Sequence, residues 1–283
     1  MAAAISNIDR FHSGRALTFS EANEISNEKY THLIGILGEY AAGKTTMLAA
    51  IYLLLAHREL NGFTFKSSLT IPAFEEIAAK AREWANNKPS GAPPHTIVDT
   101  KEFPPVLHLE IVDEIGISNL LLTDLPGEWT QDLIATEYKP EQFGFLHRCD
   151  CILYCLDAHK LESDIGELRK LRILFERLTK QAELSAHIPI FIVLTKIDLV
   201  SNLSQDLLDK VAALSDAFGY SPQLRRIAAW SQSSDIPAGS GVADLVSDIL
   251  RSNKWQLQVA EKSKSPDGYQ NLRNFHSLGL KRS

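Results

Sequence analysis

The sequence predicts an α/β fold: a mainly parallel β-sheet with one antiparallel edge strand and helices on both faces. Three observations predict it. Short apolar runs alternate along the chain with segments of helical periodicity, which is the pattern of strand–helix–strand units. A loop of small residues at 38–45 joins the first apolar run to the first helical segment. The chain has 283 residues, 45% of them hydrophobic, which is enough to bury a full core.

Each element follows from its local pattern. Continuous apolar runs predict buried strands, and apolar residues at spacings of three and four predict helices. In chain order, the expected strands are 32–37, 106–112, 118–123, 151–156, 188–194 and 224–229, and the expected helices are 45–60, 72–86, 161–184, 205–217 and 242–252. Strands 106–112 and 118–123 follow one another closely, so we expect an edge hairpin that leads into a central strand.

The pattern divides the chain into three regions. Residues 1–30 are polar and lack clear periodicity, so we expect an N-terminal arm or an irregular lead-in. Residues 31–252 form the domain, with an insertion at about 61–105. Its last part, 87–105, is rich in proline and glycine, and loops of that length are usually functional. Residues 253–283 have few apolar side chains and predict a mildly basic tail.

Composition narrows the class of protein. The formal net charge of −6 argues against a general nucleic-acid binder. No run approaches the roughly 18 apolar residues of a membrane span, and the first residues do not resemble a secretion signal. The three cysteines, Cys149, Cys151 and Cys155, are close enough for a metal site, but residues 150–157 read as a buried strand in which cysteine is a small apolar residue. We therefore expect a reduced, cytoplasmic protein.

The strongest motif is Gly-Glu-Tyr-Ala-Ala-Gly-Lys-Thr at Gly38–Thr45, a full match to the phosphate-binding loop between a strand and a helix. Such a loop directs backbone N–H groups, and the N-terminus of the next helix, at phosphates. We expect Lys44 to reach the β- and γ-phosphates and the Thr45 hydroxyl to ligate Mg²⁺. The expected nucleotide contacts in this segment are Gly38, Glu39, Tyr40, Ala41, Ala42, Gly43, Lys44, Thr45 and Thr46.

A second motif, Asp-Leu-Pro-Gly at Asp124–Gly127, directly follows the apolar strand 118–123. An aspartate at the carboxyl end of a strand beside the phosphate loop can hold Mg²⁺ through a water molecule. The N–H of Gly127 can then meet the γ-phosphate. We therefore expect Asp124 in the metal site and Gly127 among the catalytic groups.

A third motif, Thr195-Lys196-Ile-Asp198, ends the strand 188–194 and selects the base. The Asp198 carboxylate can accept two hydrogen bonds from guanine, and adenine offers no such pair, so a site built on this pairing rejects adenine. The stem of Lys196 is expected to lie across the ring. The alternative for Asp198 is a simple helix cap. A weaker segment, residues 228–231, adds Ala229 and Ser231 as candidates for a backbone contact with the guanine oxygen.

These motifs resemble the first, third and fourth G boxes of translation-factor-related, Ras-like GTPases over about residues 31–252. More closely, residues 41–52, Pro-Pro-His-Thr at 93–96 and Leu-Thr-Asp-Leu-Pro-Gly-Glu-Trp at 122–129 resemble the bacterial double-GTPase group. The resemblance implies a Ras-like strand order with an inserted helix, GTP or GDP and Mg²⁺ as ligands, and a second GTPase or an effector protein as partner. It also implies a role in bacterial conflict or defence.

The sequence departs from the Ras-like pattern in two places. The segment between Lys44 and Asp124 is about twice as long as a minimal domain needs, and it contains the expected switch threonine. We expect Thr96 to be this Mg²⁺ ligand, with Thr100 as the runner-up; either could be an ordinary loop threonine. The other departure is near the γ-phosphate, where Tyr40 replaces a glycine and Glu128 replaces the water-orienting glutamine. Trp129 could shield the site or anchor its own segment on the core.

We therefore expect a GTP-hydrolysing molecular switch with Lys44, Gly127 and Glu128 as its catalytic groups, slow without a partner. Two alternatives remain from the residues alone. One is a nucleotide-stabilised interaction module with little turnover, which Tyr40 and the missing glutamine favour. The other is an ATP-dependent phosphate-loop enzyme, against which Asp198 argues.

Overall fold

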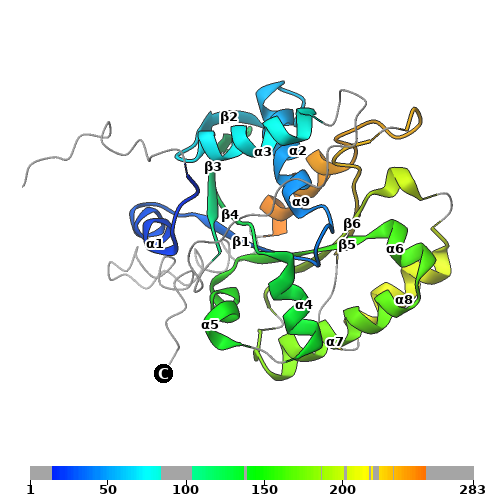
Figure 1. Cartoon of the computed structure of the whole chain (residues 1–283). Helices are drawn as coiled ribbons and strands as arrows, with labels where there is room; N and C mark the ends of the chain where they lie inside the picture. Colours follow the sequence, from blue (N-terminus) through cyan, green and yellow to red (C-terminus); the bar gives the residue numbers. More distant parts are fainter. Residues whose placement is uncertain are drawn as a thin grey trace, which may run out of the picture.

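The computed structural model describes residues 15–83, 104–136, 139–185, 187–200, 203–216, 218, 223–231 and 233–252 (Figure 1). The described strands are β1 (His32–Leu37), β2 (Thr64–Ser67), β3 (Val106–Val112), β4 (Ile117–Thr123), β5 (Cys151–Asp157), β6 (Ile190–Thr195) and β7 (Gln223–Arg226). The described helices are α1 (Phe19–Glu28), α2 (Lys44–Ala56), α3 (Ile71–Glu83), α4 (Gly127–Ala135), α5 (Pro140–Phe143), α6 (Ala158–Ser163), α7 (Gly166–Lys180), α8 (Gln205–Asp216) and α9 (Val242–Ser252), with short 3₁₀ turns η3 (Gly144–Arg148) and η4 (Ile197–Leu199). The predicted α/β class is confirmed.

The described strands form one sheet in the order β2-β3-β4-β1-β5-β6-β7. The strands from β4 to β7 run parallel, and β3 pairs antiparallel with β4 in the predicted hairpin. The antiparallel strand is not the outermost one, because β2, from the expected insertion, pairs with its outer side. Strand β2 carries Lys66 and a register shift between Phe65 and Ser67, both typical of an edge protected from pairing with another chain.

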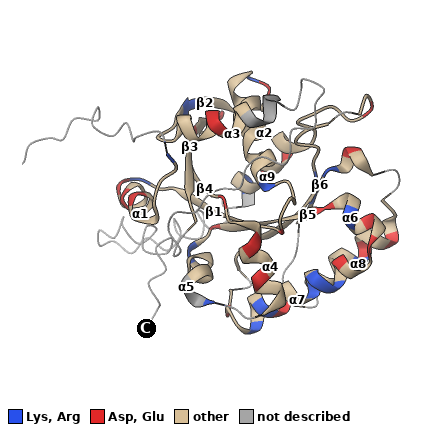
Figure 2. Cartoon of the chain, in the orientation of Figure 1, with Lys and Arg blue, Asp and Glu red and all other residues tan. Residues whose placement is uncertain are grey.

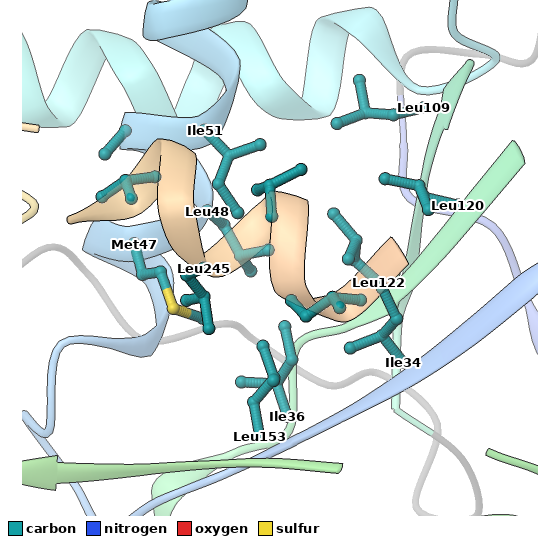
Figure 3. Close-up of a cluster of buried hydrophobic side chains, with 14 of the residues drawn as sticks. Ile34, Ile36, Met47, Leu48, Ile51, Leu109, Leu120, Leu122, Leu153 and Leu245 are labelled. Atoms are coloured by element: carbon teal, nitrogen blue, oxygen red, sulfur yellow. The ribbon is translucent and has the colours of Figure 1, made fainter. Parts of the chain in front are cut away.

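Helices cover both faces of the sheet and enclose two cores. Helices α2, α3 and α9 lie on one face, and α1, α4, α5, α7 and α8 lie on the other (Figure 1). Figure 3 shows the first core, where side chains of the sheet such as Ile34, Ile36 and Leu153 meet Met47 of α2 and Leu245 of α9. Strand β1 alternates between the cores, since Leu33 and Leu37 belong to the second. It is buried on both faces, as its continuous apolar run predicts.

The expectation of an arm or irregular lead-in at residues 1–30 is wrong for residues 19–28, which form α1. The helix begins with a capping box, in which the Glu21 N–H donates to the Thr18 hydroxyl and the Thr18 N–H donates to the Glu21 carboxylate. Phe19, Ala22 and Ile25 are buried in the second core. An apolar stripe of two turns is too short to stand out among polar residues, so only packing against the sheet reveals it.

The helix expected at 161–184 is two helices, and this part of the prediction is wrong. Helix α6 begins earlier, because the Asp157 carboxylate at the end of β5 caps it by accepting from the N–H groups of His159 and Lys160. It stops at Asp164, whose carboxylate accepts from the Gly166 N–H at 2.7 Å. A side chain that bonds to nearby backbone in this way competes with the helix, so the chain turns before α7 begins.

The cysteines are buried free thiols. Cys151 and Cys155 of β5 lie in the core under α2 and α9, whereas Cys149 lies in the core on the opposite face. Burial raises the pKa of all three thiols. The interpretation of Cys151 and Cys155 as small apolar side chains of a buried strand is confirmed, and Cys149 is buried at the end of η3, just before the strand.

Asp150, just before β5, is the basis of a stability prediction. Burial raises the pKa of its carboxyl to about 7, although the Leu33 N–H donates to it at 2.8 Å. Between pH 3.8 and about 7 the folded protein keeps this proton, whereas the unfolded chain releases it. The contribution of Asp150 to the free energy of unfolding therefore falls as the pH rises through this range. Asp150→Asn, which keeps an acceptor oxygen for Leu33, is expected to become progressively more stable than wild type across this range, by at most about 1.4 kcal/mol per pH unit.

Urea unfolding at several pH values measures this difference. The exposed Asp206, on α8, provides the control, and Asp206→Asn should show no such trend. His32 and His108 act in the opposite direction, because burial lowers the pKa of both to about 4. They are unchanged in the variant, so their effect cancels in the comparison. A difference between Asp150→Asn and wild type that does not vary with pH would contradict the prediction.

Candidate functional site

The three motifs converge at one edge of the sheet. Strand β1 runs parallel to β4 on one side and to β5 on the other, and β5 runs parallel to β6, so their carboxyl ends lie together. The loop Gly38–Thr45 leaves β1 at this edge, Asp124 follows β4, and Thr195 ends β6. In an open α/β sheet this edge is where ligands bind. The structure thus brings together segments from three distant parts of the chain.

The phosphate loop has the backbone that its glycines permit. Gly43 has φ of 85°, a left-handed conformation that favours glycine, and it is the first residue before α2. A Cβ atom at this position would also come within 3.3 Å of the Thr195 side chain. The Thr195 hydroxyl donates to the Ala42 carbonyl at 2.8 Å, which ties the end of β6 to the loop. Ala41 is also left-handed, with φ of 59°.

Lys44 is buried beneath this loop. Its ammonium donates to the carbonyl oxygens of Gly38 at 2.7 Å and Glu39 at 3.0 Å, which places the charge inside the curve of the loop. Burial lowers the pKa of Lys44, and nearby anionic groups that include Asp124 and Glu128 oppose that effect. A cation held among backbone carbonyls is suited to receive a phosphate oxygen.

Thr45 and Asp124 supply oxygen atoms of the kind that Mg²⁺ prefers. The Thr45 hydroxyl lies 3.5 Å and 3.4 Å from the two carboxylate oxygens of Asp124, which is itself buried. The two residues are 79 positions apart in sequence and meet because β1 and β4 are parallel neighbours. A hydroxyl and a carboxylate at this spacing fit a magnesium ion that retains water ligands.

Gly127 packs directly on the phosphate loop. A Cβ atom at Gly127 would lie 2.5 Å from the backbone N and Cα of Tyr40, so this contact requires glycine. Glu128 is exposed in the first turn of α4, and the Tyr40 side chain is 39% exposed. Trp129 packs edge-on against Phe143 at 6.3 Å between ring centres, the contact expected of an anchor on the core.

Lys196 is oriented by an ion pair. Its backbone is left-handed, with φ of 57°, and its ammonium donates to the Asp157 carboxylate at 2.6 Å. Asp157 is fixed in turn as the cap of α6 and is only 6% exposed. The Ile197 N–H reaches the Ile227 carbonyl, which joins the segment to the chain after β7. Asp157 therefore holds the side chain of Lys196, and the chain after β7 holds the backbone that follows it.

Asp198 has a buried oxygen atom with no hydrogen-bond partner. Among the described residues, nothing donates to its Oδ1. Burial raises the pKa of Asp198, against the effects of its own backbone N–H and of Lys196. An unsatisfied buried carboxylate oxygen is costly, and an N–H donor of a bound ligand would supply the missing hydrogen bond. The two N–H donors on one edge of guanine fit it.

Two of the remaining predicted site residues, Ala229 and Ser231, lie just after β7. Ala229 is half-buried and packs against the core, and the Ser231 hydroxyl accepts from the Ser233 N–H at 3.0 Å, which shapes the turn after β7. Both residues closely follow Ile227, whose carbonyl accepts a hydrogen bond from the Ile197 N–H, so the chain that contains them begins beside the carboxyl end of β6. Thr96 and Thr100 lie outside the described residues, and their role as Mg²⁺ ligands stays a prediction.

Three further residues of the site, Asp157, Thr130 and Lys170, are not predicted by the motifs. Asp157 pairs with Lys196, and its position at the carboxyl end of an apolar strand, like that of Asp124, was the available signal. Thr130 accepts a hydrogen bond from the Gly38 N–H at 3.2 Å and links α4 to the loop. Lys170 of α7 donates to the Glu39 carboxylate at 3.0 Å. No local pattern marks Lys170, because it meets the loop across 131 positions of sequence.

The model of one family, Double-GTPase 2, matches residues 32–250. Among solved structures, RocCORdC of Methanosarcina barkeri Roco2 bound to GDP is 14% identical, with a TM-score of 0.39 over 79% of this chain and 50% of that one. A GTP-binding protein from Sulfolobus solfataricus in complex with GDP is 17% identical, with a TM-score of 0.42 over 84% of this chain and 55% of that one.

The chain thus spans about half the length of both of these proteins. No curated protein matches the chain. In the described part of the chain, every helix is too short or too polar to cross a membrane.

Proposed function

Because the chain belongs to the Double-GTPase 2 family, we propose that it is a molecular switch that binds GTP with Mg²⁺ and hydrolyses it under the control of a partner protein. In the GTP state, contacts of the γ-phosphate would order the segment that starts at Asp124 and continues into α4, and hydrolysis would release it. A bacterial paired-GTPase system, with a possible role in conflict or defence, and a cytoplasmic location belong to this proposal.

The unpartnered Oδ1 of Asp198 is the observation that carries the proposal. It lies in the segment whose Thr195 is bonded to the phosphate loop and whose Lys196 is held by Asp157. A phosphate loop by itself serves many nucleotides, whereas a buried acceptor at the base end favours guanine over adenine. The combination supports a guanine nucleotide as the ligand.

Thr45 and Asp124 are the described residues that would hold Mg²⁺, with Thr96 proposed to join them. Bound there, the ion supplies positive charge that offsets the charge of the phosphates. Lys44, whose ammonium lies inside the curve of the loop, is proposed to bind the β- and γ-phosphates. Gly127, which packs against the Tyr40 backbone, is proposed to donate its N–H to the γ-phosphate. Glu128 is proposed to accept a proton from the attacking water.

Nucleotide competition tests the proposal directly. Purified protein loaded with a fluorescent GDP analogue is challenged with GDP, GTP, ADP or ATP in Mg²⁺. We expect unlabelled guanine nucleotides to displace the probe at concentrations at least about 100-fold lower than adenine nucleotides. Equal displacement by ATP would favour the alternative of an ATP-dependent phosphate-loop enzyme.

An interaction module with little turnover is the second candidate function. Tyr40, 39% exposed beside Gly127, and Glu128 in place of glutamine are the observations that favour it. Both candidates bind GTP, so turnover separates them. A rate that stays near zero with every partner tested would favour the module.

Hydrolysis is expected to be slow in the isolated chain and to depend on Glu128 when a partner is present. A carboxylate beside the γ-phosphate repels it unless a cation is added, and a supplied arginine can raise the rate by about 10³–10⁵. Single-turnover hydrolysis is measured at increasing protein concentration, and again with the product of any neighbouring GTPase gene. We expect acceleration in one of these series and its loss in Glu128→Ala.

GTP affinity is the control for this variant. Glu128 is exposed, so its truncation should leave the fold and the binding of GTP nearly unchanged. An exposed residue of the same helix, Asp132, provides a matched variant, Asp132→Ala, that should retain the acceleration. An isolated chain that already turns over several times per second would contradict partner dependence.

A further inference from the structure

Glu39 is an unusual neighbour for a phosphate site. It is the second residue of the phosphate loop, and its side chain is only 12% exposed. Its backbone carbonyl accepts from Lys44 and from the Ala42 N–H, so the position of residue 39 sets both the first turn of the loop and the ammonium of Lys44. A carboxylate here adds negative charge next to a ligand that is itself strongly negative.

A second buried carboxylate lies close to Glu39. Glu167, in the first turn of α7, is 7% exposed. Lys170, one turn further along the helix, donates to Glu167 at 2.8 Å and to Glu39 at 3.0 Å. One ammonium therefore bridges two carboxylates between the phosphate loop and α7. Figure 2 shows that basic residues gather along α7, beside acidic residues of α4.

Burial and charge around this bridge shift the pKa values of Tyr154 and Lys170. The phenol of Tyr154 in β5 is buried beside the two carboxylates, and burial, with the charges of Glu39 and Glu167, raises its pKa. Burial alone would lower the pKa of Lys170, but its bonds to Glu167 and Glu39 outweigh this and raise the pKa above its usual 10.5. Lys170 itself is 38% exposed, but its partners Glu39 and Glu167 are only 12% and 7% exposed, so removing the lysine leaves two largely buried carboxylates without their shared cation.

We propose that Lys170 is a positioning residue of the phosphate loop, whose ammonium neutralises Glu39 and fixes the loop for phosphate binding. This inference rests on the proposed nucleotide-binding function and goes beyond it, because it assigns a role to a residue outside all three motifs. Lys170 also couples the loop to α7, and α7 packs against α4, the helix that starts at Gly127 (Figure 1).

The expected effect is on nucleotide affinity. Lys170→Met keeps the apolar stem but removes the charge, so Glu39 of the phosphate loop and Glu167 of α7 lose their shared cation. We expect GDP and GTP to bind about tenfold more weakly, the size of effect that one uncompensated charge produces near a protein surface. Lys170→Arg keeps the cation and should stay within about threefold of wild type.

The double variant Glu39→Gln/Lys170→Met decides whether charge is the cause. It should recover most of the lost affinity, because the carboxylate beside the phosphates is then absent. A role limited to packing predicts no recovery. The matched control is Lys180→Met, on the same helix, since Lys180 makes an exposed pair with Glu176 and should bind GDP like wild type.

Isothermal titration of each full-length variant with GDP in Mg²⁺ gives these affinities, and circular dichroism checks the fold. If Lys170→Met does not fold, Lys170→Gln replaces it, with the same expected loss. Wild-type affinity in the charge-removing variant overturns the proposal, and so does the absence of recovery in a folded double variant.

The titration also separates this inference from the proposed function. If wild type binds ADP rather than GDP, the guanine assignment fails and the same series is measured with ADP, because the phosphate loop does not select the base. If wild type binds neither nucleotide, both proposals fail.

Discussion

Lys44→Ala is expected to abolish measurable GTP binding while the protein stays folded. In the structure the ammonium lies within the phosphate loop, bonded to the carbonyls of Gly38 and Glu39. These contacts hold it where the β- and γ-phosphates are expected, and charge-assisted bonds to phosphate are among the strongest that a side chain makes. Losing two of them corresponds to a loss of affinity of roughly 100-fold or more.

Equilibrium binding of a fluorescent GTP analogue measures the effect. Lys210→Ala removes an exposed lysine on α8 and should bind like wild type. Thr45→Ala should lose only the part of the affinity that Mg²⁺ provides, so it should match wild type in the presence of EDTA. If Lys44→Ala binds GTP with wild-type affinity in Mg²⁺, the assignment of Gly38–Thr45 as the phosphate-binding loop is wrong.

The second large effect is expected at the base. Asp198→Asn should lower the affinity for GDP by roughly 100-fold and raise the affinity for xanthosine diphosphate. The carboxylate that accepts from two guanine N–H groups becomes an amide that both accepts and donates. Xanthine, which carries an oxygen in place of the guanine amino group, matches that pattern.

Stability provides the control for this variant. Asp198 Oδ1 has no partner among the described residues, and burial raises the pKa of the carboxyl, so the ligand-free fold gains little from its charge. We therefore expect the ligand-free variant to unfold at nearly the same urea concentration as wild type. Thermal shifts with GDP and xanthosine diphosphate measure the change in preference. An unchanged preference for GDP would remove Asp198 from the base site.

The sequence predicted the central strands, the α/β class and the motif segments. Such features depend on short-range rules: a continuous apolar run marks a strand that is buried on both faces, as in β1, and the loop Gly38–Thr45 has a fixed spacing between strand and helix. The parallel order of the strands then places Asp124 and Thr195 at the same edge as the loop. Family membership agrees with this part of the prediction.

Short-range rules failed where local signals were weak or in competition. Helix α1 has an apolar stripe of only two turns, and its burial against the sheet is what distinguishes it from an irregular segment. The apolar periodicity continues on both sides of Asp164 as if one helix ran through, so it gives no sign of the break between α6 and α7. Strand β2 is exposed at all but its last residue, so no apolar run marks it, and pairing with β3 is what makes it a strand.

The pairings that connect the site were decided only by the tertiary structure. Lys170 meets Glu39 across 131 positions, and Lys196 meets Asp157 across 39. A charged side chain in a sequence pattern looks the same whether it faces solvent or a buried partner. Its partner is fixed by how helices pack on the sheet, which depends on the fit of whole faces rather than on any local run of residues. The sequence by itself determined which chemical groups the site contains, and packing decided which of them hold one another in place.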